Sequence, residues 1–203
     1  MVRGAGPVIR DAKKAATRRA LIQHAVALFC ERGFEKTTVD DIVAAVGCSQ
    51  RTFFRHFAAK EDVVFEGIAE RLDELSGLLA TVPDEEPGWT AVRDNMRLLT
   101  RQYTDEDPEL TAVRIRLWMT EPLLYARWTE ISLTWERELT QFLVARRADE
   151  CTPGGFDLDA EVAAAAVVAA LRAAWRGEVL NGGRFDELVE RALGLLERGL
   201  AGL

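Results

Sequence analysis

The sequence predicts an all-α protein in which a small N-terminal domain of three helices precedes a larger helical bundle. Three observations support this fold class. Apolar residues recur at helical spacing along the 203-residue chain, and no segment alternates in the manner of a β-strand. A short helix, a turn that contains glycine and a second short helix are predicted between Thr38 and Phe57, which is the helix-turn-helix pattern. Positive charge is concentrated in the same part of the chain.

The charge balance divides the chain in two. Residues 1–60 hold 11 Lys and Arg against 5 Asp and Glu, whereas the rest of the chain holds 15 against 28. A basic segment on an acidic body is the electrostatic footprint of a domain that binds nucleic acid, attached to a part that does not. The alternative is that the basic residues only form a solvated surface. Their coincidence with the helix-turn-helix pattern favours the nucleic-acid interpretation.

Composition argues against several other classes of protein. The longest apolar run, residues 162–171, is too short to span a bilayer, so we expect no contact with a membrane. No apolar stretch follows the basic N-terminal residues, so no signal peptide is predicted. The three widely spaced cysteines and two histidines lack the spacing of metal ligands. We therefore expect no metal, no cofactor and a cytoplasmic location.

A flexible arm is predicted over residues 1–10, followed by a first helix from about Asp11 to Arg32 with one apolar face. Gly33 and Phe34 come next. This order is typical of a helix end, in which glycine adopts the left-handed conformation and the next apolar side chain folds back on the helix.

The second helix is predicted to begin at Thr38, whose hydroxyl can cap it, and to end at Gly47. Ser49 then caps a short third helix that reaches about Phe57. With the first helix, these two complete a helix-turn-helix DNA-binding domain over residues 11–60.

A fourth helix is predicted from about Lys60 to Ala80, and we place the domain boundary after residue 60, within this helix. Residues 61–203 then form a helical bundle for ligand binding and dimerisation. Prolines and glycines divide its remainder into helices near residues 89–104, 109–121, 122–149, 158–180 and 185–201.

The third helix has the composition of a recognition helix. Side chains in the first turn of such a helix reach base edges in the major groove. That turn holds Ser49, Gln50, Arg51 and Thr52. Gln50 could bind an adenine through two hydrogen bonds, and Arg51 a guanine. Arg55 and His56 suit either phosphate contacts or packing between the helices.

Lys60 stands at the expected start of the fourth helix, where a cation opposes the helix dipole. A DNA phosphate held there by backbone N–H groups and the lysine together would resolve this conflict. The alternative is a lysine that is merely exposed.

Three motifs in residues 17–66 are specific when taken together. They are Ala25-x-x-Leu28-Phe29-x-x-x-Gly33-Phe34, Thr37-Thr38-Val-x-x-Ile42 with Gly47 behind it, and Ser49-x-x-Thr52-Phe-Phe-Arg-His-Phe57-x-x-Lys60-Glu61. This part of the chain resembles the N-terminal domain of the TetR/AcrR family of bacterial transcriptional regulators.

The resemblance implies a homodimer that places two recognition helices in successive major grooves of double-stranded operator DNA and binds a small-molecule effector in each C-terminal domain. It also implies roles by position. Phosphates would be held by Thr38, Phe54, His56 and Lys60, and bases would be read by Gln50, Arg51 and Thr52. The family often has Tyr where Phe54 stands, so a hydroxyl-to-phosphate bond is absent here.

Aromatic and long apolar residues gather in the C-terminal part, as the walls of a ligand cavity require. The candidates are Met96, Tyr103, Arg114, Trp118, Met119, Trp128, Ile131, Trp135 and Trp175. Arg114 could meet a carboxylate or phosphate head group, or pair with a surface glutamate. The same set also describes an ordinary core. The segments Arg51-Thr-Phe-Phe-Arg-x-Phe57 and Arg116-Leu-Trp-Met-x-Glu-Pro122 are similar to a subgroup of the family that senses acyl-CoA-like or other lipophilic ligands, and drug-like or phenolic effectors stay open.

The helix over residues 158–180 is apolar almost all round, so we expect it to be buried on several sides. With the last helix it would form half of a four-helix bundle between two subunits of a homodimer.

The sequence thus predicts a ligand-responsive transcriptional regulator, in the first place a repressor that a small lipophilic effector releases from its operator. An effector-independent DNA-binding or architectural protein is the alternative. An enzyme in the C-terminal domain is a remote alternative, because both histidines lie before residue 60 and leave no Ser/His/Asp or Cys/His set behind it. We therefore expect no enzymatic activity.

Overall fold

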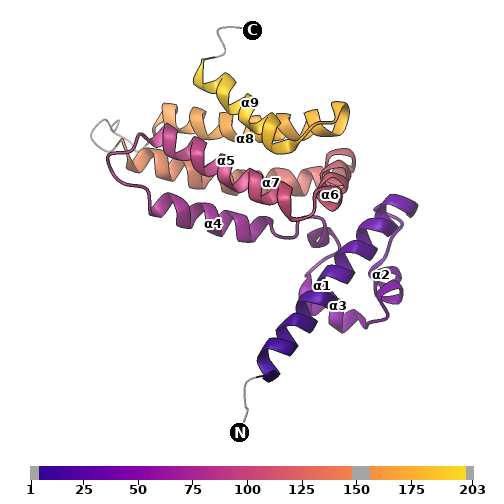
Figure 1. Cartoon of the computed structure of the whole chain (residues 1–203). Coiled ribbons are helices and arrows are strands. Elements are labelled where there is room, and N and C mark those ends of the chain that lie inside the picture. The colour runs from indigo at the N-terminus through magenta and orange to yellow at the C-terminus, as the bar shows by residue number, and fades with distance from the viewer. Residues whose placement is uncertain (1–4, 148–155, 200–203) are drawn as a thin grey trace. The chain divides into compact units, whose positions relative to one another are not determined.

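The computed structural model describes residues 5–147 and 156–199 of the chain (Figure 1). These residues form nine α-helices and one short 3-10 helix, and no strand occurs among them, which confirms the predicted all-α class. The chain divides into two compact units between Glu66 and Gly67, a few residues beyond the boundary that the sequence suggested.

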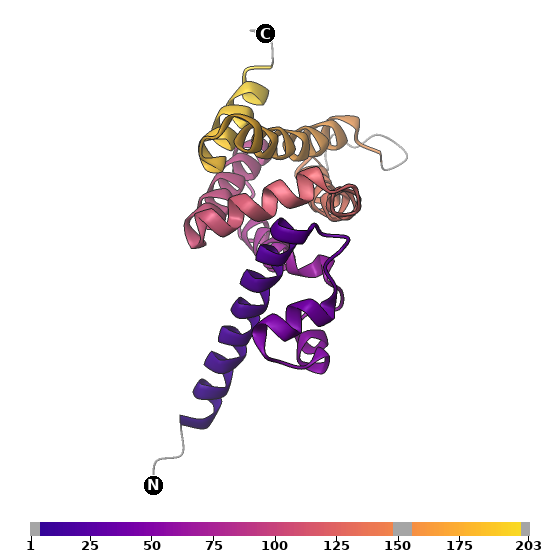
Figure 2. The ribbon, with the colours of Figure 1, turned by 90° about the vertical axis from the view of Figure 1, so that its right-hand side faces the viewer.

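The N-terminal unit consists of one long helix and three short ones, α1 (Ala5–Arg32), α2 (Val39–Val46), α3 (Gln50–His56) and the 3-10 helix η1 (Glu61–Val63). Figure 2 shows α2 and α3 beside α1, and α2 packs on both α1 and α3. Residues 5–10, which we predicted as part of a flexible arm, belong to α1. Pro7 is compatible with this because the N–H groups of a first helical turn need no partner within the helix.

The end of α1 and the start of α2 follow the predicted pattern. Gly33 has a φ of 88°, its amide donates to the Phe29 carbonyl at 3.0 Å, and the Phe34 ring folds back to 5.0 Å from the Phe29 ring. At α2, the Thr38 hydroxyl accepts from the Asp41 amide at 3.1 Å, and the Asp41 carboxylate accepts from the Thr38 amide at 2.8 Å. This is a complete capping box, so these two hydrogen bonds fix where the helix begins.

The prediction of one helix from Lys60 to Ala80 is wrong. η1 ends at Val63, and α4 (Ile68–Ala80) begins only after Gly67, which has a φ of 80°. Val63, Val64 and Phe65 are consecutive and all buried. Three consecutive residues cannot share one face of a helix, so burial of all three favours a break in the helix at this point.

The C-terminal unit contains α4 and five further helices, α5 (Gly88–Glu106), α6 (Pro108–Thr120), α7 (Pro122–Ala145), α8 (Leu158–Asn181) and α9 (Phe185–Glu197). These five match the predicted helices within a few residues, although predicted positions 148–149 and 200–201 lie outside the described ranges. α8 packs on both α7 and α9, and α5 packs on α4 and α9 (Figures 1 and 2). None of the described helices combines the length and the apolar character that a bilayer crossing requires.

Candidate DNA-binding surface and effector pocket

α3 has a buried side and an exposed side. Phe53 and His56 are buried, and the Phe53 ring lies 5.6 Å from that of buried Phe57. The exposed residues of the helix are Gln50, Arg51, Phe54 and Arg55. Their spacing places them on one side of a helix. This side is open for contact with DNA, and Phe54, which lacks a hydroxyl, lies within it.

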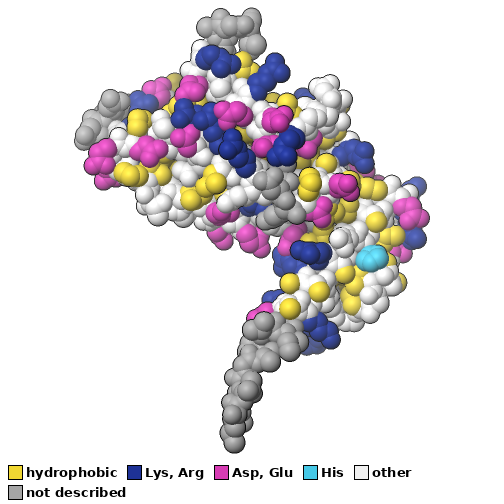
Figure 3. Space-filling model, in the orientation of Figure 1, with side chains coloured by type: hydrophobic (Ala, Val, Ile, Leu, Met, Phe, Trp, Pro, Cys, Tyr) yellow, Lys and Arg dark blue, Asp and Glu magenta, His cyan; other side chains and the backbone are white. Residues whose placement is uncertain are grey.

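Arg51 and Arg55 are the basic groups of this surface. Neither guanidinium has a hydrogen bond or ion pair among the described residues. Figure 3 shows Lys and Arg intermixed with Asp and Glu over the C-terminal unit, where Arg93 pairs with Glu197 at 2.5 Å. α3 itself contains no acidic residue, so its two exposed arginines suit a polyanion.

Other predicted DNA contacts have hydrogen-bonding roles inside the unit. The Ser49 hydroxyl accepts from the Thr52 amide at 3.2 Å and lies 3.0 Å from the Thr52 hydroxyl. The Thr38 hydroxyl donates to the Asp41 carboxylate at 2.5 Å while it caps α2. Ser49 and Thr38 therefore act first as helix caps, and any contact with DNA would be additional.

Lys60 is neither merely exposed nor placed as the sequence suggested. Its ammonium donates to the carbonyl oxygens of Phe34 at 2.7 Å and Thr37 at 2.9 Å, with a longer bond of 3.4 Å to Glu35. It also lies 4.3 Å from the centroid of the Phe34 ring. These contacts join the α1–α2 loop to the segment after α3. A phosphate would have to compete with three carbonyl oxygens for the same ammonium.

His56 is buried, and both of its ring nitrogens lie without a hydrogen-bond partner among the described residues. Burial lowers the pKa of His56, and the positive charges of Arg55, Arg18 and Lys14 lower it further, while Glu66 acts in the opposite direction. A neutral, buried imidazole is suited to packing between helices. Of the two roles expected for His56, the geometry favours this one over a phosphate contact.

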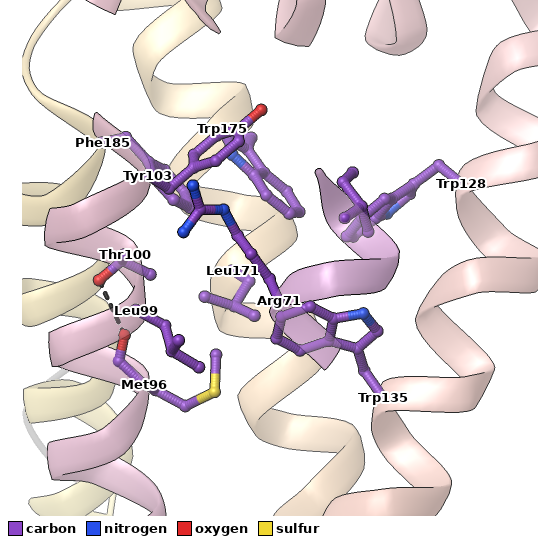
Figure 4. Close-up of a pocket in the computed structure, with 11 residues that line it drawn as sticks. Arg71, Met96, Leu99, Thr100, Tyr103, Trp128, Trp135, Leu171, Trp175 and Phe185 are labelled. Atoms are coloured by element: carbon purple, nitrogen blue, oxygen red, sulfur yellow. Dashed lines mark hydrogen bonds between the residues drawn. The ribbon is translucent and has the colours of Figure 1, made fainter. Parts of the chain in front are cut away.

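A partly open cavity lies in the C-terminal unit, lined by side chains from α4, α5, α7, α8 and α9 (Figure 4). Its walls are Ile68, Arg71, Met96, Leu99, Thr100, Tyr103, Trp128, Trp135, Leu171, Trp175 and Phe185. About 40 Å³ is open to water-sized molecules. Sites for small-molecule ligands usually enclose roughly 300–1,000 Å³, so these walls must move before such a ligand can enter.

Five of the nine predicted ligand-binding residues line this cavity, namely Met96, Tyr103, Trp128, Trp135 and Trp175. The other four do not. Trp118 stands behind the wall, with its ring stacked 4.8 Å from that of Trp128. Arg114 and Met119 belong to the same helix, α6, which contributes no wall residue among those described. Ile131 lies on α7 but is only half-buried and outside the wall.

Six wall residues lie outside the nine predicted ones, namely Ile68, Arg71, Leu99, Thr100, Leu171 and Phe185. Arg71 is the informative one. Arg71 follows Ile68 by about one helical turn, so the two side chains lie on the same side of α4. A charged residue beside the apolar stripe of this helix could therefore have marked Arg71 as a wall residue in the sequence. Its guanidinium carbon lies 5.0 Å from the centroid of the Tyr103 ring, and Figure 4 shows it extending from α4 towards that ring.

The aromatic walls contain donors that lack acceptors. The Trp175 ring meets that of Trp128 edge-on at 4.4 Å and stacks on that of Phe185 at 4.9 Å. The indole N–H groups of Trp135 and Trp175 are buried and have no hydrogen-bond partner among the described residues. Buried donors are normally satisfied, so these two unpaired N–H groups are exceptions within the aromatic cluster.

A helix-turn-helix unit with exposed arginines, followed by a helical unit around an apolar cavity, defines a helix-turn-helix transcriptional regulator. Residues 21–66 match the family described as "Bacterial regulatory proteins, tetR family", and residues 86–201 match the "MftR C-terminal domain". The chain belongs to the TetR family of bacterial transcriptional regulators, as the sequence motifs indicated.

Known relatives support this assignment along most of the chain. The transcriptional regulator TcmR of Streptomyces glaucescens is 32% identical over 176 residues, which cover 84% of this chain and 75% of TcmR. Two solved structures show the same fold. FadR of Thermus thermophilus in complex with lauroyl-CoA has a TM-score of 0.58 at 22% identity, covering 90% of this chain and 94% of FadR. SmeT of Stenotrophomonas maltophilia in complex with triclosan has a TM-score of 0.61 at 21% identity, covering 92% and 91%.

Proposed function

We propose that the chain is a ligand-responsive repressor, whose homodimer holds operator DNA through α3 and releases it when a small lipophilic molecule occupies the cavity of the C-terminal unit. The observation that carries this proposal is the apolar cavity with aromatic walls, which lies in a unit separate from the one that presents exposed arginines. The site proposed to bind the effector is thus distinct from the surface proposed to bind DNA, as allosteric regulation requires.

On the DNA side, the exposed side of α3 supports base reading by Gln50 and Arg51, with Arg55 on a phosphate. Ser49 and Thr38 would add contacts from the helix ends that they cap, and Thr52 would add one from the first turn of α3. Such a dimer would hold two recognition helices about 34 Å apart, one turn of the duplex. A regulator of this kind meets its operator in the cytoplasm.

On the effector side, flat aromatic and aliphatic walls support a ligand with an apolar body. The relatives support the lipophilic class, because FadR is seen with lauroyl-CoA and SmeT with triclosan. An acyl-CoA-like effector is one member of this class. The predicted set of ligand-binding residues is accordingly revised to the cavity walls, with Trp118 as a support behind Trp128.

The coupling between the two functions would pass through α4. Ile68 and Arg71 form part of the cavity wall, and α4 follows the helix-turn-helix unit directly in the chain. A ligand larger than the present cavity must displace some of its walls. We propose that displacement of α4 changes the spacing of the recognition helices, so that the occupied state binds DNA less well.

Dimerisation would use α8 and α9. The large apolar residues of α8 that remain exposed are Leu158, Val162 and Leu180, spaced to lie along one side of the helix. This side is not covered by α7 or α9 in the described chain, which suits a face that meets a second copy. Light scattering at micromolar concentration should give the mass of a dimer, and the mass of a monomer would contradict the proposal.

The small size of the cavity favours one alternative function, an effector-independent DNA-binding protein. The deciding experiment begins with selection of operators from a randomised duplex pool at physiological salt. An enriched palindrome with half-sites about one turn apart supports the dimeric regulator. The enriched duplex then serves as the probe in a screen of acyl-CoA thioesters and of flat aromatic compounds. Release by one class identifies an effector, whereas unchanged DNA binding with every compound favours the alternative.

A further inference from the structure

A hydrogen bond crosses the helix-turn-helix at the start of α3. Gln50 is the first residue of α3, and its side-chain Nε2 donates to Oδ1 of Asp40 in the first turn of α2. Both side chains are exposed. No Lys or Arg pairs with Asp40 among the described residues, whereas the neighbouring Asp41 lies 3.7 Å from Arg32. Asp40 therefore directs its charge towards Gln50 and the solvent.

The chemistry of the two groups fixes the orientation of the amide. An ionised carboxylate can only accept hydrogen bonds, whereas a glutamine amide has a donor end and an acceptor end. The donor end of Gln50 must therefore face Asp40. Its oxygen, Oε1, is left to meet another molecule. A glutamine without such a neighbour could turn either end towards a base.

We infer that Asp40 is a specificity-determining residue, which holds Gln50 with its oxygen towards the major groove and so selects a base that carries an exocyclic amine. Adenine and cytosine present such an amine in the major groove, while guanine and thymine present oxygen acceptors at that edge. Two acceptors facing each other repel, which disfavours guanine and thymine. This inference rests on the proposed role of α3 in reading operator DNA.

The charge of Asp40 has a second, separable consequence. A carboxylate beside the duplex repels the phosphates of every sequence alike. Asp40 should therefore lower the affinity for all duplexes while it increases the contrast among the four bases opposite Gln50. A residue that acts only through net charge would change the overall affinity and leave the contrast unchanged.

The test uses the full chain and the operator enriched from the randomised pool. Affinities are measured for the four operator versions that differ at the base assigned to Gln50, which is the position where Gln50→Ala abolishes the preference. The unaltered protein should bind the versions with adenine or cytosine at least about fivefold more tightly than those with guanine or thymine. This ratio is at the lower end of the discrimination that one base contact provides. Asp40→Asn keeps the shape of the side chain, but the asparagine amide can either accept or donate a hydrogen bond. The variant should therefore bind all four operator versions more tightly. Its preference for adenine and cytosine should fall to about twofold or less.

Glu35→Gln is the matched control, because it makes the same change of charge at an exposed residue of the α1–α2 loop. It should preserve the preference. In the Gln50→Ala background, Asp40→Asn should cause no further change in preference, since both substitutions act through one amide. Thermal unfolding of each variant checks that the fold is intact.

The outcomes separate this inference from the function on which it rests. A specific operator whose preference survives Asp40→Asn overturns the role of Asp40 and leaves the regulator intact. An equal loss of preference with Glu35→Gln also overturns it, because the effect is then one of net charge. Failure to enrich any operator contradicts the proposed function itself.

Discussion

Lys60 is held by carbonyl oxygens from residues more than twenty positions earlier in the chain, so its removal should affect stability before it affects DNA binding. Lys60→Met keeps most of the aliphatic stem but leaves the carbonyls of Phe34 and Thr37 without their charged donor. Hydrogen bonds to charged groups are worth about 1.5–3 kcal/mol, and we expect a loss of unfolding free energy of about that size in urea.

Lys36→Met is the control for this prediction, because Lys36 is exposed in the same loop. It should change stability by less than about 0.5 kcal/mol. The salt dependence of operator binding distinguishes the two roles of Lys60. Loss of a phosphate contact reduces the slope by about one unit, whereas loss of a structural contact leaves it unchanged. A reduced slope at unchanged stability would restore the phosphate role.

His56 should make the N-terminal unit less stable in mild acid. Burial and the neighbouring Arg55, Arg18 and Lys14 lower the pKa of His56 in the folded state, whereas an unfolded histidine titrates near about 6.5. Above that pH, the imidazole of His56 is neutral in both the folded and the unfolded state. As the pH falls below it, the unfolded state takes up the proton first, and the stability therefore decreases.

Urea unfolding at pH 7.5 and at pH 5.5 measures this effect. His56→Leu removes the titrating group and should reduce the difference between the two pH values, while His24→Gln, at an exposed position, should preserve it. A difference that persists in His56→Leu would assign the acid sensitivity to other groups.

For single residues, the sequence predicted those roles that depend on contacts with nearby residues in the chain. Thr38 and Ser49 cap their helices through atoms three residues away, and both caps are present as expected. The roles of Lys60 and His56 could not be obtained in this way. Their surroundings come from α1 and from the loop that follows it, which only the folded chain brings together.

The element on which prediction and structure differ most is the segment from Lys60 to Ala80, and two glycines test the difference. Gly67 has a φ of 80° before α4, whereas Gly77 is exposed inside that helix. A Cβ at either position would meet no atom within 4 Å, so a substitution changes only the backbone preference.

Gly67→Ala should therefore lower the free energy of unfolding by about 1–2 kcal/mol, the cost of a left-handed conformation for a residue with a side chain. Gly77→Ala should raise it by about 0.5–1 kcal/mol, because alanine is the better helix former. Each effect is measured in urea. If one continuous helix ran through both positions, both substitutions would raise the free energy of unfolding. Changes of opposite sign therefore support a helix that begins only after Gly67.

The other helices were easier to predict because their ends carry strong signals. Pro108 and Pro122 stand at the first positions of α6 and α7, and Asp157 caps α8 through the amide of Ala160 at 3.1 Å. Before Gly67, the apolar run Val63–Phe65 is followed by Glu66, and such a run is compatible with helix periodicity until tertiary burial is known.

For the whole molecule, the sequence predicted a helix-turn-helix unit and a helical unit with candidate cavity walls, but only part of those walls. Trp128, Trp135 and Trp175 were found because large aromatic residues mark a cavity or a core. Arg71 was not, because its position in the wall depends on how α4 packs on α5 and α7. The α6 candidates do not line this cavity, and Trp118 instead stacks on the wall residue Trp128.

The last prediction concerns the proposed dimer interface on α8. Val162 is 58% exposed on the side of α8 that we assign to a second copy, and Leu133 is 53% exposed on α7. Val162→Arg should place a charge in the proposed interface and convert the dimer to a monomer. A monomer contacts one half-site only, so operator affinity should fall by about 10²–10⁴-fold through the loss of the second contact.

Leu133→Arg introduces the same charge at a similarly exposed apolar residue outside the proposed interface, and it should leave both the mass and the operator affinity nearly unchanged. Light scattering and binding to the full palindrome measure both effects. Affinity for a single half-site adds a further check, because Val162→Arg should not reduce it if α3 is intact. Dissociation caused by Leu133→Arg in place of Val162→Arg would move the interface from α8 to α7, and with it the surface through which two recognition helices are held one duplex turn apart.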